Sequence, residues 1–198
     1  MKLVLATQNP KKLKEMNEIL SHLGVEVVSE AELGVRIEVE ETGDTFTDNA
    51  RLKATAVMQA TGLPAVADDS GLCVDALNGG PGVYSARFGG EGLDDKGRYT
   101  LLLEMLRGQT DRAAHFHTSI VCAFPNGDEL VCEGECLGTI AFAPMGEGGF
   151  GYDPVFFVPE LRKTFGQLTA EEKASVSHRG KALRAFAAAL DDYLKGNE

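Results

Sequence analysis

The sequence predicts an α/β protein with one domain over residues 1–198, and three observations lead to this prediction. The apolar run "KLVLA" at residues 2–6 precedes apolar residues at helical spacing that stop at Gly24, and this strand-then-helix order recurs along the chain. Asn126-Gly127 lies between two strand-like runs and predicts a hairpin, so the sheet is expected to be mixed. With 43% hydrophobic and 25% charged residues, the 198-residue chain can bury one substantial core.

Periodicity and capping signals place the expected elements in order. Gly24 and Gly62 each end a helical pattern, Thr169 with Glu172 has capping-box spacing, and a last helix is expected to begin near Ser177. The expected strands are 2–6, 25–30, 64–67, 113–124, 130–136 and 155–158. The expected helices are 10–23, 45–62, one around 101–106, and two that begin near 169 and 177.

Composition limits the function and the location. The net charge of −11 argues against a general nucleic-acid binder, because neutralising a phosphate backbone needs a concentrated basic face. No apolar run approaches the ~20 residues of a membrane helix, and the N-terminal "MKLVLATQNP" is too short in apolar residues for a signal peptide. A cytoplasmic protein without a membrane partner is therefore expected.

The loop "TQNPKK" at residues 7–12 is a candidate anion site. Asn9 is expected as the N-cap of the first helix and Pro10 as its first residue. The N–H groups of Lys11 and Lys12 would then point out of the helix as unpaired donors and join two ammonium groups at the positive end of its dipole. An ordinary capped helix with solvated lysines is the alternative, and the chain contains no P-loop motif.

Carboxylates gather in two stretches. Residues 38–44 contain four, and Asp68-Asp69 follow the apolar run 64–67 directly, so charge stands where a buried strand is expected to end. Acids close together repel unless a cation neutralises them, and oxygen ligands without thiolate or imidazole suit Mg²⁺. The 38–44 stretch could equally be a solvated acidic loop. Asp68-Asp69 are more indicative of a site, because ligand sites in open α/β sheets lie beyond the strand ends.

Two further stretches could bind an anion or a base. In a chain this acidic, Lys173 and the cations of "SHRGKA" (177–182) stand out, since cations are unfavourable at a helix N-terminus. The glycine-rich "GEGGFGYDP" (146–154) could stack an aromatic ring on a base and direct a carboxylate to its edge. Surface charge and a plain glycine-rich connection are the alternatives.

The cysteines and two histidines suggest no metal site. Cys132 and Cys136 would lie roughly 13 Å apart along one strand, beyond the ~7 Å limit of a disulfide, so buried free thiols are expected. His115 and His117 would share one strand face, and a polar strand face is a better interpretation of them than zinc binding because no third ligand is evident.

Together the motifs resemble the inosine triphosphate pyrophosphatase family, which hydrolyses altered purine nucleoside triphosphates. The matching motifs, in family order over nearly the whole chain, are "TQNPKK", "EETG", "FTDNARLKA", "ADDSGL", "GGFGYDP" and "EEKASVSHRGKAL". One departure is Gln8, where a small residue is expected, and it puts the detailed shape of the first loop in doubt.

The resemblance implies a fold, a reaction and an assembly. The fold is an elongated mixed sheet with two α/β lobes flanking a central nucleotide-binding cleft, and the protein works as a homodimer. A purine nucleoside triphosphate such as ITP, dITP or XTP and water give the monophosphate and pyrophosphate, with Mg²⁺ as cofactor. No nucleic acid takes part.

The resemblance also implies residue roles. The triphosphate is held by Thr7, Gln8, Asn9, Pro10, Lys11, Lys12, Lys53 and Ser70. The base is held by Phe150, Gly151, Tyr152, Asp153, Lys173, His178 and Arg179. The catalytic base is Asp69, which also binds the metal together with Glu40 or Glu41.

Two alternatives remain at this point. A nucleotide sensor would bind the same triphosphate without cleaving it, and release of pyrophosphate would distinguish the two. A related pyrophosphatase of the septum-inhibitor type would act on modified pyrimidines, and "SHRGKA" together with "GGFGYDP" argues against it.

Overall fold

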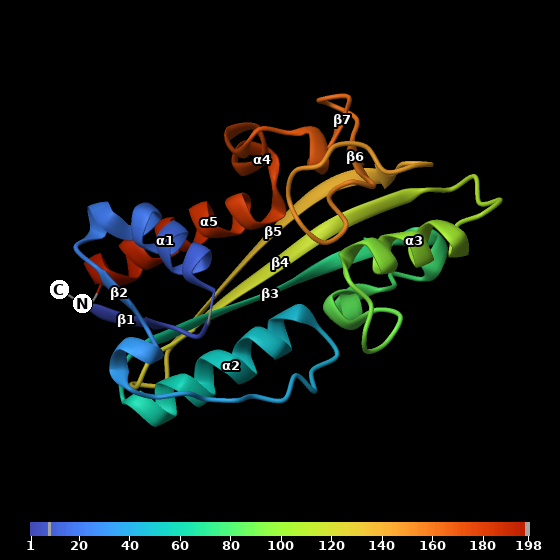
Figure 1. Cartoon of the computed structure of the whole chain (residues 1–198). Helices are drawn as coiled ribbons and strands as arrows, with labels where there is room; N and C mark the ends of the chain where they lie inside the picture. Colours follow the sequence, from blue (N-terminus) through green and yellow to red (C-terminus); the bar gives the residue numbers. More distant parts are fainter. Residues whose placement is uncertain (8, 197–198) are drawn as a thin grey trace. The chain divides into compact units, whose positions relative to one another are not determined.

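The computed structural model describes residues 1–7 and 9–196 (Figure 1). Gln8, predicted to help hold the triphosphate, lies outside the described residues. The helices are α1 (Pro10–Leu20), α2 (Phe46–Thr61), α3 (Asp95–Met105), α4 (Ala170–Val176) and α5 (His178–Gly196). The strands are β1 (Lys2–Leu5), β2 (Glu26–Ser29), β3 (Ala65–Val74), β4 (Ala113–Ala123), β5 (Glu129–Ile140), β6 (Phe156–Val158) and β7 (Lys163–Thr164).

The sheet is mixed, as the sequence predicts. Across the described residues its strand order is β2-β1-β3-β4-β5-β6-β7. Strand β1 pairs in parallel with β2 and with β3, whereas β6 pairs antiparallel with β5 and β7. The turn between β4 and β5 is closed by the Phe124 N–H, which donates to the Asp128 carbonyl at 3.0 Å, so Asn126-Gly127 forms the expected hairpin. The predicted mixed α/β class is confirmed.

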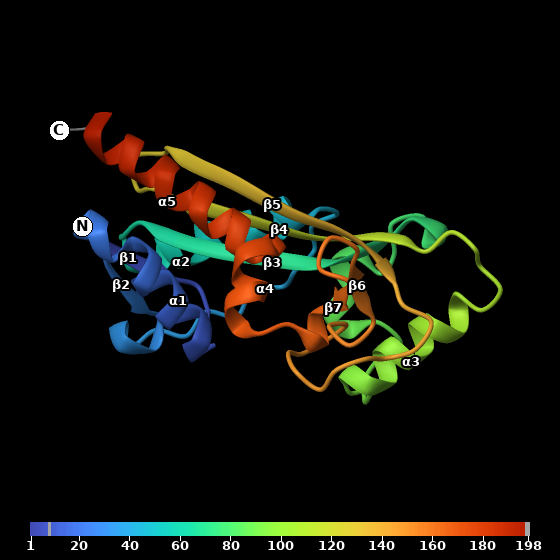
Figure 2. The same cartoon turned by 90° about the horizontal axis from the view of Figure 1, so that it is seen from above.

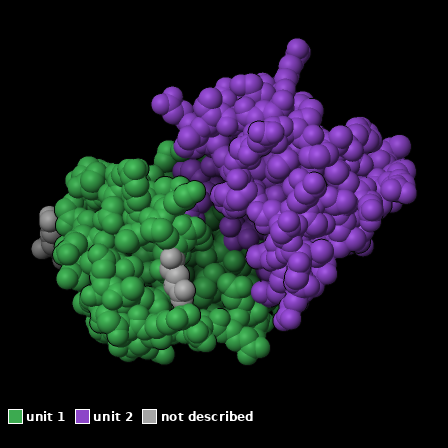
Figure 3. Space-filling model, in the orientation of Figure 1, with its two compact units in different colours: residues 1–69, 118–134, 181–198 green, residues 70–117, 135–180 purple. Residues whose placement is uncertain are grey.

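The chain divides into two compact units (Figure 3). Unit 1 comprises residues 1–69, 118–134 and 181–198, and unit 2 comprises residues 70–117 and 135–180. Strands β3, β4 and β5 and helix α5 each contribute residues to both units. The prediction of one functional domain over the whole chain stays a prediction.

Unit 1 has helices on both faces of its strands. Helices α1 and α5 pack through Met16 and Phe186 against Leu3, Leu5 and their neighbours on one face, and Figures 1 and 2 both show these two helices side by side. Helix α2 packs against the other face, where its small and branched residues meet β1, β3 and β4. Because both faces are covered, β1 is apolar at consecutive positions, as buried parallel strands are.

Unit 2 has its own core. Buried residues of β3, α3, β4, β5 and β6 form it, together with Tyr152 and Phe165. The rings of Phe116, Phe156 and Phe165 meet with centroids 4.7–5.6 Å apart, in edge and stacked geometries that stabilise aromatic pairs. This cluster supports the segments on either side of the 146–154 loop.

Local signals predicted most element boundaries well. Asn9 caps α1, whose first residue is Pro10, and Gly24 and Gly62 adopt left-handed backbone after their helices. The Thr169–Glu172 capping box is present, and α5 begins at His178.

The expected end of a strand at residue 67 is wrong. Strand β3 continues through the aspartates to Val74. Its partner β1 ends at Leu5, which pairs with Val66, so β3 extends beyond β1. The two aspartates therefore lie beyond the end of β1, although β3 itself does not end there.

Among the described residues, no helix is long and apolar enough to cross a membrane.

Candidate active site

Asp68 and Asp69 lie in the interior of β3, just past the carboxyl end of β1. Side chains alternate between the two faces of a strand. Val66 packs in the α1 and α5 cluster and Ala67 in the α2 cluster, so Asp68 belongs to the α1 face and Asp69 to the α2 face. The contacts of the two carboxylates follow this alternation, since Asp68 meets a lysine of α1 and Asp69 an asparagine of α2.

Lys12 of α1 reaches Asp68. Its Nζ donates to Asp68 Oδ2 at 2.7 Å, and the aspartate is only 4% exposed. The expectation that the N–H groups of Lys11 and Lys12 are unpaired donors is wrong, because Lys11 N donates to the Asn9 side chain at 2.9 Å and Lys12 N donates to the Asn9 carbonyl at 3.1 Å. The cap satisfies these donors, and the Lys12 ammonium remains the cation of this loop.

The rest of the first loop shapes the helix entry. Thr7 is half-buried, and its hydroxyl accepts the Asn9 N–H at 3.2 Å. Asn9, Pro10 and Lys11 are exposed.

Lys53 of α2 has acceptors on three residues. Its Nζ donates to Glu41 Oε1 at 2.8 Å and to the Asp68 carbonyl at 2.9 Å, and it lies 3.7 Å from Asp69 Oδ1. Together Lys12, Glu41, Lys53, Asp68 and Asp69 form what we call the acid–lysine cluster. All five residues belong to unit 1.

Asn49 is a site residue that the sequence analysis did not single out. It is fully buried on α2, where its Nδ2 donates to Asp69 Oδ2 at 3.3 Å and its Oδ1 accepts the Gly43 N–H at 2.8 Å. It therefore ties Asp69 to the acidic segment 38–44. The signal in the sequence is that Asn49 is a polar residue among the apolar positions Phe46 and Ala50 of this helix.

Glu40 and Glu41 have different environments in the structure. Glu40 is exposed, whereas Glu41 is half-buried against Lys53. Oxygens of Glu41 and Asp69 thus lie within 3.7 Å of one ammonium. Ser70, the next residue of β3, is exposed and belongs to unit 2.

Asp153 organises the 146–154 loop in unit 2. It is 3% exposed, accepts the Phe150 N–H at 2.9 Å and pairs with Lys173 of α4 through the same oxygen, Oδ2. Burial raises the pKa of the Asp153 carboxyl, and the Lys173 ammonium opposes that rise. Gly149 has φ +81°, and a Cβ there would overlap the Asp153 carboxylate. In this structure Asp153 holds the loop rather than pointing toward solvent.

The loop presents one aromatic face. Phe150 is 76% exposed, and Lys173 Nζ lies 4.7 Å from its ring centroid. Tyr152 is buried in the unit 2 core, where its hydroxyl donates to the Ser85 carbonyl at 2.8 Å and burial raises its pKa. Of the two rings considered for stacking on a base, only Phe150 is available at the surface.

Asp95 of α3 was also missed. Its Oδ2 accepts the N–H of Gly151 at 2.7 Å, which joins the loop to the first turn of α3. Because the two residues are 56 apart in sequence, no local pattern announces this contact.

His178 and Arg179 occupy the first turn of α5, and both are half-buried. The His178 ring stacks on Phe116 with a centroid distance of 4.6 Å and an interplanar angle of 12°. The Ser177 hydroxyl accepts the Gly180 N–H at 3.1 Å, and a Cβ on Gly180 would overlap the Ala174 carbonyl. The α4–α5 turn is therefore tightly specified and fixes where the His178 and Arg179 side chains begin.

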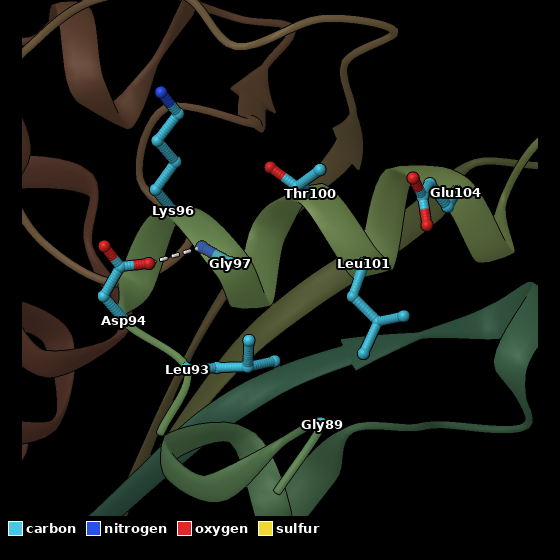
Figure 4. A pocket seen from close by; sticks show the side chains of 8 residues that line it. All are labelled: Gly89, Leu93, Asp94, Lys96, Gly97, Thr100, Leu101 and Glu104. Atoms are coloured by element: carbon cyan, nitrogen blue, oxygen red, sulfur yellow. Dashed lines mark hydrogen bonds between the residues drawn. The ribbon is translucent and has the colours of Figure 1, made fainter. Parts of the chain in front are cut away.

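A pocket of about 570 Å³ is lined by residues of α3 and of the segment before it (Figure 4). Its lining residues are Gly89, Leu93, Asp94, Lys96, Gly97, Thr100, Leu101 and Glu104. In Figure 4 Leu93 and Leu101 lie on the side of the helix that faces Gly89. Of the described residues predicted to bind substrate or metal, none lines this pocket.

The cysteines are free and the two strand histidines share one strand face, as expected. All four cysteines are free, three of them buried and Cys73 half-buried. His117 Nδ1 lies 3.2 Å and His115 Nε2 3.9 Å from the same oxygen of Glu135, so the two rings do share a strand face. Among the residues that the structure describes, no group of three or more His, Cys, Asp or Glu side chains is arranged to hold a metal ion.

Comparison with known proteins decides the family. The model of the Ham1 family matches residues 3–189. The chain belongs to the Ham1 family. A relative from Exiguobacterium, named dITP/XTP pyrophosphatase, is 50% identical over 99% of this chain and 100% of its own. Another of that name, from Thermus thermophilus, is 53% identical over 97% of this chain and 93% of its own.

The Ham1 fold is confirmed by a solved structure. A HAM1 protein from Coxiella burnetii superposes with a TM-score of 0.93 at 43% identity, covering 97% of this chain and 99% of that one. The family resemblance inferred from the sequence motifs is therefore confirmed.

Proposed function

We propose that this protein hydrolyses non-standard purine nucleoside triphosphates, such as dITP and XTP, to the monophosphate and pyrophosphate. Two Ham1 relatives at least 50% identical carry the name dITP/XTP pyrophosphatase, and they match almost the whole chain. The protein is accordingly an enzyme, a hydrolase of a phosphoanhydride bond.

One observation from the structure supports this function above the others. Two lysines from different helices meet the adjacent aspartates of β3 in the acid–lysine cluster. Phosphoryl transfer depends mainly on positioned charge, with cations for the phosphate oxygens and a carboxylate to orient the attacking water. The cluster supplies both kinds of group within unit 1.

The chain's own residues would divide the work as follows. Lys12 and Lys53 bind phosphate oxygens, with Thr7, Asn9 and Ser70 as polar neighbours. Asp69 orients the water and accepts its proton, while Asn49 holds the Asp69 carboxylate through the bond at 3.3 Å. The water oxygen bonds to the attacked phosphorus and the bond from that phosphorus to the bridging oxygen breaks, which releases monophosphate and pyrophosphate.

The donor chemistry of the cluster fits Mg²⁺. The ion is usually held by one or two carboxylates plus phosphate oxygens and water, so a cage of three or more protein ligands is not required. Asp69 and Glu41 would hold it, because their oxygens already converge on the positive charge of Lys53. Glu40, exposed in this structure, is the less favoured second ligand. When bound, Mg²⁺ would neutralise phosphate charge and lower the pKa of the attacking water.

Unit 2 would bind the base. The exposed Phe150 ring offers a stacking surface, and Lys173, His178 and Arg179 offer donors for the 6-oxo group of hypoxanthine or xanthine. Gly151 and Asp153 shape the loop, and Tyr152 supports it from the core. Adenine presents a 6-amino donor at that position, which would leave buried donors unpaired.

The proposal also includes a homodimer, a cytoplasmic location and no nucleic-acid partner. These three parts depend on the family resemblance and on the net charge of −11.

The test is an assay of the purified protein with ITP, dITP, XTP, GTP and ATP, with and without Mg²⁺. We expect pyrophosphate and monophosphate from ITP, dITP and XTP only when Mg²⁺ is present. Release of orthophosphate would contradict the proposed bond cleavage. Tight binding of ITP without turnover would support the sensor alternative, and turnover of modified pyrimidine triphosphates alone would support the septum-inhibitor type.

A further inference from the structure

Asp68 connects both lysines of the acid–lysine cluster. Its carboxylate accepts from Lys12 Nζ at 2.7 Å, and its main-chain carbonyl accepts from Lys53 Nζ at 2.9 Å. Lys12 belongs to α1 and Lys53 to α2, so one residue of β3 receives a lysine from each of the two helices.

The fold itself does not require a charge at this position. Asp68 is 4% exposed, and the three residues before it, Ala65, Val66 and Ala67, are fully buried and apolar. Burying a carboxylate is costly unless it is paired and hydrogen-bonded. An apolar residue would continue the strand without that cost, so the charge is explained by what it holds.

Asp68 holds the Lys12 ammonium, which can still donate hydrogen bonds to a second ligand. A lysine Nζ has three donors, and the contact with Asp68 uses one of them. The aspartate is buried, whereas the Lys12 side chain keeps 30% of its surface exposed. The buried carboxylate therefore fixes the position of an ammonium group that remains accessible.

We propose that Asp68 is a positioning residue for the triphosphate: its side chain orders Lys12, and its carbonyl orders Lys53, before substrate arrives. This inference rests on the proposed function, since it takes both lysines to be phosphate ligands. It assigns to Asp68 a role that is separate from that of Asp69, on the opposite face of the strand.

A masking role and a positioning role of Asp68 predict opposite effects of its removal on phosphate binding. Asp68 is an anion near an anion site, and if it only masked Lys12, its removal would strengthen phosphate binding. If it positions Lys12, its removal leaves a long side chain that must be ordered on binding, which weakens phosphate binding roughly three- to tenfold. The sign of the change therefore separates the two roles.

The experiment measures binding of inorganic tripolyphosphate, without Mg²⁺, by titration calorimetry. The proteins are the full chain and its Asp68→Ala, Asp68→Asn, Lys12→Ala and Lys12→Ala/Asp68→Ala variants. We expect Asp68→Ala to weaken binding roughly three- to tenfold. Asp68→Asn, whose amide oxygen can still accept from Lys12, should stay closer to the parent. In the Lys12→Ala background, removal of Asp68 should cause no further loss.

Matched controls separate positioning from folding. Glu18→Ala removes an exposed acid of the same unit and should not weaken tripolyphosphate binding. Thermal unfolding of each variant identifies any loss that comes from an unfolded fraction, and Asp68→Asn, which is nearly isosteric, keeps the comparison valid if Asp68→Ala folds poorly.

Several outcomes would overturn the inference. Tighter binding by Asp68→Ala and Asp68→Asn would make the residue a mask. A loss of equal size in the presence and absence of Lys12 would make it purely structural. Failure of the parent chain to bind tripolyphosphate would remove the site and this inference together, whereas binding without ITP hydrolysis would defeat the proposed function alone.

Discussion

Lys53 Nζ lies 2.8 Å from Glu41 Oε1, in an ion pair between α2 and the acidic segment 38–44. The same ammonium also donates to the Asp68 carbonyl. A phosphate that binds Lys53 must therefore share this ammonium with Glu41 or displace the carboxylate. If Glu41 binds Mg²⁺ as proposed, its displacement from Lys53 would couple metal binding to phosphate binding.

Lys53→Ala should weaken binding of a nucleoside triphosphate at least about tenfold and that of the monophosphate much less. The reason is that charge-assisted hydrogen bonds to the outer phosphates are lost, and the monophosphate lacks those groups. Calorimetric titration with ITP and IMP in the presence of Ca²⁺ would measure both affinities. Lys14→Ala, which removes an exposed lysine of α1, is the control. Equal losses for the two ligands would place Lys53 elsewhere.

Asp69→Asn should lower kcat by ~10²–10⁴ while triphosphate binding persists, because a positioned general base is lost. Asparagine keeps the shape of the side chain and can still contact Asn49. Pyrophosphate release measured beside nucleotide affinity checks this, with Asp75→Asn, in the short helix after β3, as a control. Near-normal turnover would exclude Asp69 from the chemistry.

Gly149→Ala should impair the 146–154 loop more than Gly151→Ala. Both glycines have positive φ, +81° and +60°, so alanine is strained at either position, but only at Gly149 would the new Cβ also overlap Asp153. We expect a lower Tm and a higher KM for ITP in Gly149→Ala, with a smaller change in Gly151→Ala. Indistinguishable variants would show that the Asp153 contact does not determine the loop.

Arg179→Met should lower kcat/KM for ITP more than for ATP and so narrow the preference between them. Selectivity that depends on hydrogen bonds to the base can reach ~10⁴, and the donors for the 6-oxo group would be reduced. Steady-state rates with both substrates give the ratio, and Arg184→Met further along α5 serves as control. Rates that fall equally would assign Arg179 to the phosphates or the fold.

Glu172→Gln should destabilise the protein at neutral pH but not in acid. The hydrogen bond from Lys163 and the N–H of Thr169 lower the pKa of the Glu172 carboxyl below its ordinary value of 4.5. A lowered pKa in the folded state contributes stability above the ordinary pKa, and that contribution disappears as the pH falls below it. The difference in Tm between parent and variant should therefore shrink between pH 6 and pH 3. A constant difference would mean that the charge contributes nothing.

Much of the fold is determined locally and can be read from the sequence. Asn9-Pro10 at the start of α1, the Thr169–Glu172 capping box and the Asn126-Gly127 hairpin depend on residues within a few positions of each other. The helical pattern that ends at Gly62 likewise predicts α2. The family motifs are also short and contiguous, so the sequence alone carries the resemblance to the pyrophosphatase family.

Contacts between distant segments were decided by the tertiary structure alone. Alternation along β3 predicts that Asp68 and Asp69 point to opposite faces, but which helix covers each face depends on how α1 and α2 pack. That packing gives Asp68 to Lys12, Asp69 to Asn49, and Glu41 rather than Glu40 to Lys53. The physical reason is that the chemistry of a side chain is fixed by its residue type, whereas its burial and its charged neighbours depend on segments that only packing brings together.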